Sequence, residues 1–157
     1  MKQKEKIKVY RTREGNIFEL VFLVLMIIVW VLMVRLLSSA PEVVPTHFDA
    51  AGNPNSYDSK YAILFPCIMT TVAGIITMMG AYFPHTINIP GGLKTPRQYE
   101  LAIRMMRILG LTLLALTLAI GWTSLGSVRP SAVPTLAVVG VMFTVIIVFT
   151  ILIYRSR

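Results

Sequence analysis

The sequence predicts an all-α, polytopic membrane protein with four transmembrane helices in a bundle. Of its 157 residues, 55% are hydrophobic and 14% are charged, whereas soluble domains carry about 25% charged residues. Long apolar stretches with few charges are typical of transmembrane helices. Four such stretches are expected at about 17–37, 62–83, 104–126 and 135–154. One bundle of this size uses the whole chain, so residues 1–157 are expected to form a single domain.

The first apolar stretch is expected to be a retained helix. At about 1.5 Å per residue, residues 17–37 rise about 31 Å, enough to span a bilayer. Glu19 and Arg35 lie near its ends, where their charged groups can reach the interface. The small residues 38–40 resemble a signal-peptide cleavage site, but the apolar run is longer than the usual core of 7–15 residues. Pro41 also follows the cleavage point directly, which favours the retained helix.

The second stretch has a recognisable beginning and end. Asp58 or Ser59 can cap its N-terminus by accepting a hydrogen bond from a backbone N–H group. Pro66 falls in an early turn, where a proline costs less than in the middle of a helix. Residues 84–95 contain two prolines and a Gly-Gly pair, so they are expected to be a turn-rich connection.

The third helix is expected to begin at Thr95-Pro96, a capping residue followed by proline at the first helical position. Its first turns, residues 96–107, are polar on one face, where Glu100 precedes Arg104 in the favourable order for an ion pair. We expect this amphipathic piece to lie at the membrane surface before the chain enters the third span. The fourth span then closes the chain.

The basic residues predict the orientation. Of the 15 Lys and Arg residues, 12 lie in the N-terminal flank, the connection between spans two and three, and the C-terminal tail. The other side holds only Arg35, Lys60 and Arg129. Because cytoplasmic loops carry an excess of Lys and Arg, both termini are expected in the cytoplasm and the loop at 41–60 outside. This placement also accounts for the net charge of +8 without nucleic acid as a partner.

Small residues one helical turn apart predict close helix packing within the bundle. They form three pairs: Thr70 and Gly74, Thr117 and Gly121, and Gly140 and Thr144. No charged residue lies in the middle of a span, which disfavours transport because ion and proton paths usually need one.

The motif P-x-x-V-P occurs at residues 41–45 and again at 130–134. Two like hairpins related by an axis along the membrane normal would produce it. Prolines that commonly follow helix ends would produce it as well, and we favour this explanation. Either way, residues 46–61 are surplus to what a simple helical hairpin requires.

The loop at 41–60 is the best candidate for a functional site. Pro45, Pro54 and Gly52 restrict or permit particular backbone conformations, so the loop is expected to be ordered. Its polar and titratable side chains are the candidate recognition residues: His47, Asp49, Asn53, Asn55, Tyr57, Asp58 and Lys60.

Four interpretations of this loop stay open. Its polar groups can simply satisfy one another and cap helices. Alternatively, Phe48 and Tyr57 anchor a recognition lid whose polar side chains face a ligand. A metal site at His47, Asp49 and Asp58 matches no standard ligand spacing. Catalysis with His47 as a base lacks a nucleophile motif. We therefore expect no enzyme, no metal and no cofactor.

Residues 41–60 read P-x-x-V-P-T-H-F-x-x-x-G-x-P-N-x-Y-x-S-K. This pattern resembles the signature of a bacterial membrane domain known as domain of unknown function 1648. In some proteins that domain precedes an SdpI-type immunity region, which protects a cell from a secreted peptide toxin and signals its presence. The additional helices of those immunity proteins are absent here, and residues 92–96 only faintly resemble their later G-[IL]-[RK]-T-P stretch. The resemblance implies a bacterial cytoplasmic (inner) membrane protein.

Two classes of function follow as hypotheses. The first is a binding, sensing or immunity-like membrane protein whose loop meets an extracytoplasmic peptide or protein. The second is a structural or accessory subunit whose loop docks onto a membrane complex. The lipid bilayer is a partner in both, and a homo-oligomer stays an open alternative. A toxin or repressor gene beside this one would favour the first class.

Overall fold

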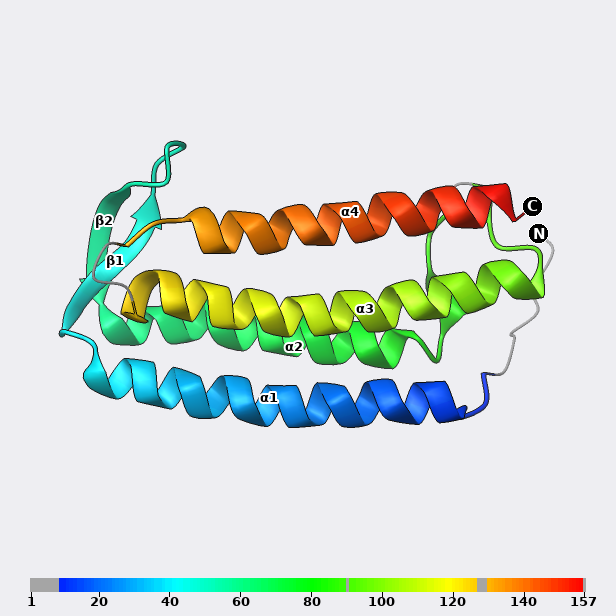
Figure 1. The fold of residues 1–157 in the computed structure, drawn as a ribbon, viewed down its shortest axis with the longest axis horizontal. Coiled ribbons are helices and arrows are strands. Elements are labelled where there is room, and N and C mark those ends of the chain that lie inside the picture. Colours follow the sequence, from blue (N-terminus) through cyan, green and yellow to red (C-terminus); the bar gives the residue numbers. More distant parts are fainter. Residues whose placement is uncertain (1–8, 90, 127–129, 157) are drawn as a thin grey trace.

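The computed structural model describes residues 9–89, 91–126 and 130–156, and within them it contains four long helices (Figure 1). These are α1 (Arg13–Ser39), α2 (Leu64–Gly80), α3 (Pro96–Gly121) and α4 (Val133–Arg155). A turn of 3₁₀-helix (Lys60–Ile63) precedes α2, and a π-helical turn (Trp122–Gly126) extends α3. With these turns included, all four helices are long and apolar enough to cross a membrane, which confirms the predicted helical class and the four candidate spans.

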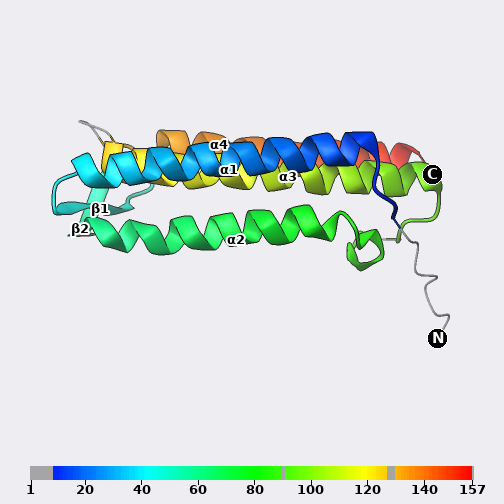
Figure 2. The same cartoon turned by 90° about the horizontal axis from the view of Figure 1, so that it is seen from below.

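Helix α3 lies at the centre of the bundle. Helices α1 and α4 flank it on opposite sides in Figure 1, and the turned view in Figure 2 shows α2 against another face. Of the apolar stretch in α3, 44% is buried, compared with 6% in α4. The outer helices therefore expose apolar side chains over most of their length, as expected of helices that face lipid.

Small residues allow two of the close helix contacts. At Gly74 of α2, an added Cβ would lie 3.3 Å from a carbonyl oxygen of α3. At Gly121 of α3 there is no room for a Cβ, because the side chain of Met33 fills that space. Gly140 and Thr144 of α4 do not form the predicted close helix contact within the bundle. Both are exposed, and nothing lies within 4 Å of a Cβ added at Gly140. Their spacing thus serves no packing within this chain.

The segment between α1 and α2 contains the one departure from an all-α fold among the described residues. Strands β1 (Val43–Phe48) and β2 (Pro54–Ser59) form a two-stranded antiparallel sheet, with irregular register around His47. The hairpin lies at the end of the bundle opposite the start of α1 and the end of α4 (Figure 1). We call these two ends the hairpin end and the terminal end. The strands form because valines, Thr46 and Phe48 favour extended backbone, and both prolines resist helix.

Side-chain caps determine where α1 and α3 begin. Helix α1 starts four residues earlier than predicted, because the Oγ1 of Thr12 accepts a hydrogen bond of 3.0 Å from the N–H of Gly15. Thr95 caps α3 as predicted, and it forms a capping box with Gln98. The fully buried amide of Gln98 also donates to the carbonyl of Ile153 at 3.1 Å. This bond joins the start of α3 to the end of α4.

The polar start of α3 does not form a separate surface helix. Residues 96–107 continue straight into the span, and α3 runs unbroken to Gly121 (Figure 1). The predicted pair between Glu100 and Arg104 is also wrong. Glu100 accepts from Arg97 at 3.1 Å, while Arg104 pairs with a carboxylate of α1 described below. Arg104 therefore pairs with a residue of a neighbouring helix and not with Glu100 of its own helix.

Glu19 of α1 finds a partner at the terminal end. The hydroxyl of Tyr82 donates a hydrogen bond to the Glu19 carboxylate. This bond raises the pKa of the Tyr82 phenol, and partial burial acts in the same direction. The interaction ties the segment just after α2 to the first turns of α1. Most of the predicted basic flank, residues 1–8, and Arg129 lie outside the described residues.

Candidate functional site: the hairpin and the cavity beneath it

Lys60 anchors the base of the hairpin. Its Nζ lies 2.9 Å from a carboxylate oxygen of Glu42 and donates to the carbonyl of Ala40 at 3.4 Å. The Lys60 side chain is only 10% exposed. The prediction that Lys60 faces a ligand is therefore wrong. The ammonium group instead holds the end of α1 close to the turn that starts α2, where a free carbonyl needs a donor.

The tip of the hairpin is fixed to α4. Gly52 has a φ of +84°, a conformation that side chains with a Cβ rarely adopt. Its carbonyl accepts a hydrogen bond of 3.2 Å from the N–H of Ala132, directly before α4. Asp49 shapes the same turn, because its carboxylate accepts from the N–H groups of Ala51 and Asn53 at 2.9 and 2.8 Å. Asp49 and Asn53 thus build the turn, and Asp49 has its hydrogen-bonding capacity partly used within the loop.

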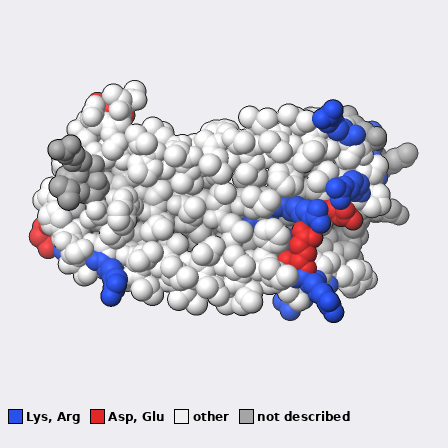
Figure 3. Space-filling model, in the orientation of Figure 1, with Lys and Arg blue, Asp and Glu red and all other residues white. Residues whose placement is uncertain are grey.

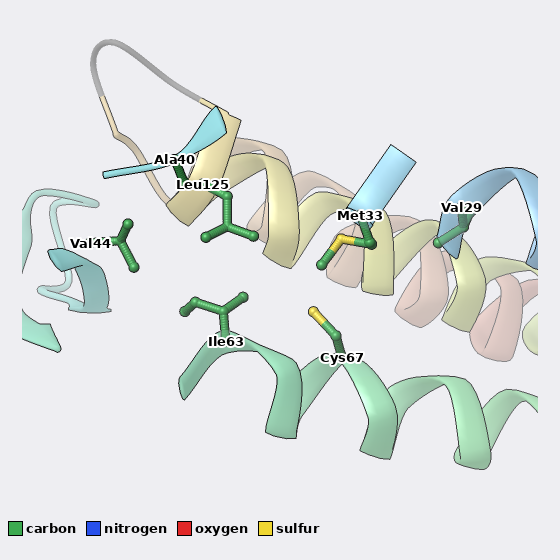
Figure 4. Packing of buried hydrophobic residues seen from close by; sticks show 7 residues of the cluster. All are labelled: Val29, Met33, Ala40, Val44, Ile63, Cys67 and Leu125. Carbon is green, nitrogen blue, oxygen red and sulfur yellow. The ribbon is translucent and has the colours of Figure 1, made fainter. Parts of the chain in front are cut away.

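The inner face of β1 is part of the hydrophobic core (Figure 4). Val44 is 1% exposed and packs in a cluster that α1, α2 and the end of α3 also supply. The cluster includes Ile63, Cys67, Met33 and Leu125. Burial of a valine side chain contributes about 1.5–3 kcal/mol to stability. Packing therefore holds the hairpin against the bundle together with the hydrogen bonds at its base and tip.

A cavity of about 230 Å³ lies beneath the hairpin. Thr46 and Phe48 of β1 line it from above, and Thr123 and Thr135 lie opposite, joined by a hydrogen bond of 3.0 Å between their hydroxyls. The remaining lining residues are Ile63, Pro66, Ile120, Ser124 and Ala132. Its walls are mainly apolar with a few hydroxyls. Sequence reasoning missed the residues from the end of α3 and the start of α4, because only the fold brings Ile120, Thr123, Ser124, Ala132 and Thr135 under the loop at 41–60.

The outer face of the hairpin carries three of the seven predicted recognition residues, His47, Asn55 and Tyr57. The Nδ1 of His47 lies 3.2 Å from the Oδ1 of Asn55 on the opposite strand. Tyr57 is 60% exposed, and Asn53 and Asp58 are exposed as well. We call His47, Asn55 and Tyr57 the outer row. These three side chains are available to a partner from outside the bundle.

Asp58 and Ser59 have separate roles. Ser59 accepts a hydrogen bond from the N–H of Tyr61 at 3.4 Å, so it caps the turn that leads into α2. Of the two predicted capping residues, Asp58 and Ser59, Ser59 is therefore the cap. Asp58 is not the cap, because its carboxylate accepts from the N–H of Ser59 at 2.6 Å. His47, Asp49 and Asp58 each have a different partner. Among the described residues, no three His, Cys, Asp or Glu side chains gather as metal ligands would.

Fold and site together define a class: a small polytopic helical protein of the membrane type, whose first two helices are joined by a packed β-hairpin. The family model of a domain of unknown function, DUF1648, matches residues 23–71. The match runs from α1 through the hairpin into α2, and it confirms the family resemblance of residues 41–60. Comparison with curated proteins found no match, and comparison with solved structures found none.

Proposed function

We propose that this protein binds an extracytoplasmic peptide or protein through its hairpin, in a binding, sensing or immunity-like role. One observation carries the proposal. The hairpin is held to the bundle at its base by Lys60, at its tip by Gly52 and along its inner face by Val44, while the outer row stays exposed. A rigid scaffold that presents exposed polar and aromatic side chains loses little conformational entropy when it binds a partner.

The charge distribution supports an extracytoplasmic hairpin in a bacterial inner membrane. Of the 15 Lys and Arg residues, 12 belong to segments at or leading to the terminal end. Figure 3 shows Lys and Arg side chains gathered at this end of the visible face, with few at the hairpin end. Positive residues favour the cytoplasmic side. The proposed orientation therefore places both termini in the cytoplasm.

The cavity beneath the hairpin gives the proposed site a second element. Its apolar walls and hydroxyl groups suit an apolar side chain or a short extended segment of a ligand, because such pockets pair hydrophobic area with a few orienting polar groups. Phe48 lines this cavity from β1, next to the outer-row residue His47. In the proposed role the outer row contacts the ligand surface and the cavity takes one anchor. The role is binding, and no catalytic step is part of it.

A second candidate function rests on α4. Only 6% of its apolar stretch is buried, and Gly140 and Thr144 present small residues one turn apart on an exposed face. In lipid, such a face lets another helix approach closely. This observation favours an accessory subunit of a membrane complex, or a homo-oligomer joined through α4.

Photo-crosslinking in intact cells distinguishes the two functions. A photoreactive amino acid replaces Tyr57 in the outer row, and in a second, matched variant it replaces Phe143, which is 62% exposed on α4. The binding role predicts that position 57 forms an adduct with a secreted peptide or protein and position 143 does not. The accessory role predicts an adduct between position 143 and another membrane protein, or a second copy of this chain.

A double variant tests whether the outer row makes the contact. His47→Ala with Asn55→Ala removes two exposed side chains that touch each other, so the fold should be kept. We expect it to reduce the adduct at position 57 several-fold, because truncating the residues that carry the binding energy of an interface costs more than about 1 kcal/mol. An undiminished adduct, or a secreted partner captured equally at position 143, would contradict binding through the hairpin.

A further inference from the structure

A second cavity, of about 210 Å³, lies at the terminal end, far from the hairpin. On one side it is lined by Thr12 and Glu14, at the N-terminus of α1, and on the other by Glu100, Arg104 and Arg107 of α3. It is level with the first turn of α1, just before the apolar run that starts at residue 17. In a membrane this is the level of the lipid headgroups.

Arg107 is the unusual residue of this cavity. The residue is only 4% exposed, yet its side chain lines the cavity. Its guanidinium lies directly against Gly15, where an added Cβ would contact Nη2 and approach Cζ to 3.0 Å. Within the described residues, no hydrogen-bond acceptor meets the guanidinium. Arginine keeps its charge in proteins, so it is a buried cation that needs an anion.

The carboxylates near Arg107 are already engaged. Glu14 receives two hydrogen bonds from Arg104, from Nε at 2.8 Å and from Nη2 at 2.9 Å. Glu100 receives one from Arg97 at 3.1 Å. Arg97 lies outside the lining, so the four charged lining residues, Glu14, Glu100, Arg104 and Arg107, sum to zero. Of these four, Arg107 is the one that no hydrogen bond within the described part of the chain joins to an opposite charge, and it acts on the Glu14 carboxylate through its charge alone. The N-terminus of α1 adds a positive partial charge from its backbone N–H groups.

We propose that this cavity binds a phosphate-type oxyanion on the guanidinium of Arg107. The planar fork of arginine donates two parallel hydrogen bonds to such a group, and the adjacent helix N-terminus favours negative charge in the same place. The phosphodiester of an anionic lipid headgroup and free phosphate share this chemistry. The level of the cavity along the bundle favours the lipid.

Thermal unfolding of the full chain in a neutral sugar detergent tests the proposal. Three additives are compared: inorganic phosphate, short-chain phosphatidylglycerol, and phosphatidylcholine of the same chain length. Anything that binds the folded state raises its melting temperature. We expect phosphatidylglycerol to raise it more than phosphatidylcholine does. A rise with phosphatidylglycerol alone assigns the site to a lipid headgroup, and a matching rise with inorganic phosphate assigns it to the free anion.

Three variants locate the effect. Arg107→Gln should weaken phosphatidylglycerol binding about tenfold or more, since bonds to charged groups are worth this much. Gly15→Ala keeps every charge but displaces the guanidinium of Arg107, so it should also weaken phosphatidylglycerol binding. This variant provides the test if Arg107→Gln does not fold. Lys94→Gln removes an exposed charge just before the same helix, outside the lining, and should bind normally. The proposal is overturned if neither phosphate nor phosphatidylglycerol raises the melting temperature, if phosphatidylcholine raises it as much as phosphatidylglycerol does, or if Lys94→Gln loses as much binding as the other variants.

Discussion

At the scale of single residues, the seven candidate recognition residues separate into distinct groups. His47, Asn55 and Tyr57 lie together on the outer face of the hairpin. Asp49 and Asn53 form its turn, and the exposed Asp58 is bonded to the N–H of Ser59, which caps the next turn. Lys60 is buried at the base. A list of polar residues in a loop cannot distinguish these roles, because each depends on which backbone groups the fold leaves without partners.

Replacing Lys60 tests its anchoring role. Lys60→Met keeps a long apolar stem but removes the ammonium group, so the carbonyl of Ala40 and the carboxylate of Glu42 lose their donor. We expect a loss of about 1–3 kcal/mol in the free energy of unfolding, the usual cost of an unsatisfied partly buried partner. Denaturant unfolding in detergent, with circular dichroism as the readout, measures this change.

Lys94→Met is the matched control, because Lys94 is exposed and lies at the other end of the bundle. It should change the free energy of unfolding by less than about 0.5 kcal/mol. Equal stability of the two variants would mean that Lys60 does not hold the hairpin.

At the scale of elements, helix α3 determines the arrangement of the others. Its capping box and Gln98 hold the end of α4, its small residues admit α1 and α2, and its C-terminal turn lies under the hairpin. Thr117 is fully buried and its hydroxyl lies 2.8 Å from that of Thr70 in α2. In lipid, where apolar surfaces gain little from association, such small residues and hydroxyl bonds contribute much of the helix packing.

Two glycine-to-alanine substitutions compare a glycine packed inside the bundle with a glycine on the exposed face of α4. Gly121→Ala places a methyl group where Met33 now lies, so the 1% exposed Met33 must move. We expect a loss of about 1–3 kcal/mol in the free energy of unfolding, typical of overpacking. Gly140→Ala meets nothing within 4 Å. It should be neutral, or stabilising by up to about 1 kcal/mol because alanine favours helix.

The same detergent unfolding measurement compares these two variants. If Gly140→Ala is the more damaging substitution, the exposed face of α4 is packed against something outside the chain. That result would support the accessory-subunit or homo-oligomer alternative.

At the scale of the whole molecule, the two ends of the bundle are chemically different. The hairpin end has the packed sheet, the mainly apolar cavity and few basic residues. The terminal end has the ion pairs of Arg97 and Arg104, the second cavity, and the Lys and Arg side chains that gather there in Figure 3. The two P-x-x-V-P motifs both lie at the hairpin end, but the first leads into β1 and the second into α4. The extra chain length between α1 and α2 is therefore used as the hairpin.

Cysteine labelling tests the orientation of the whole molecule. In a Cys67→Ala background, single cysteines are placed at Ser56 on the hairpin and at Asn88 in the connection after α2, both exposed. We expect an impermeant thiol reagent added to whole cells to label position 56 and to reach position 88 only after permeabilisation. Labelling of 88 with protection of 56 would reverse the proposed topology.

The sequence by itself determined the four candidate spans, the start of α3 at Thr95-Pro96 and the family resemblance of the segment around the hairpin. These follow from local properties: apolar length, capping chemistry and a dense motif. Only the tertiary structure decided that Lys60 is buried, that Arg104 pairs with Glu14 and not Glu100, and that residues from α3 and α4 complete the cavity beneath the hairpin. It also placed Arg107 against Gly15, 92 positions away in the chain. The physical reason is the same in each case: a charged or polar group pairs with the partner nearest in space, and in a helix bundle that partner usually belongs to another helix.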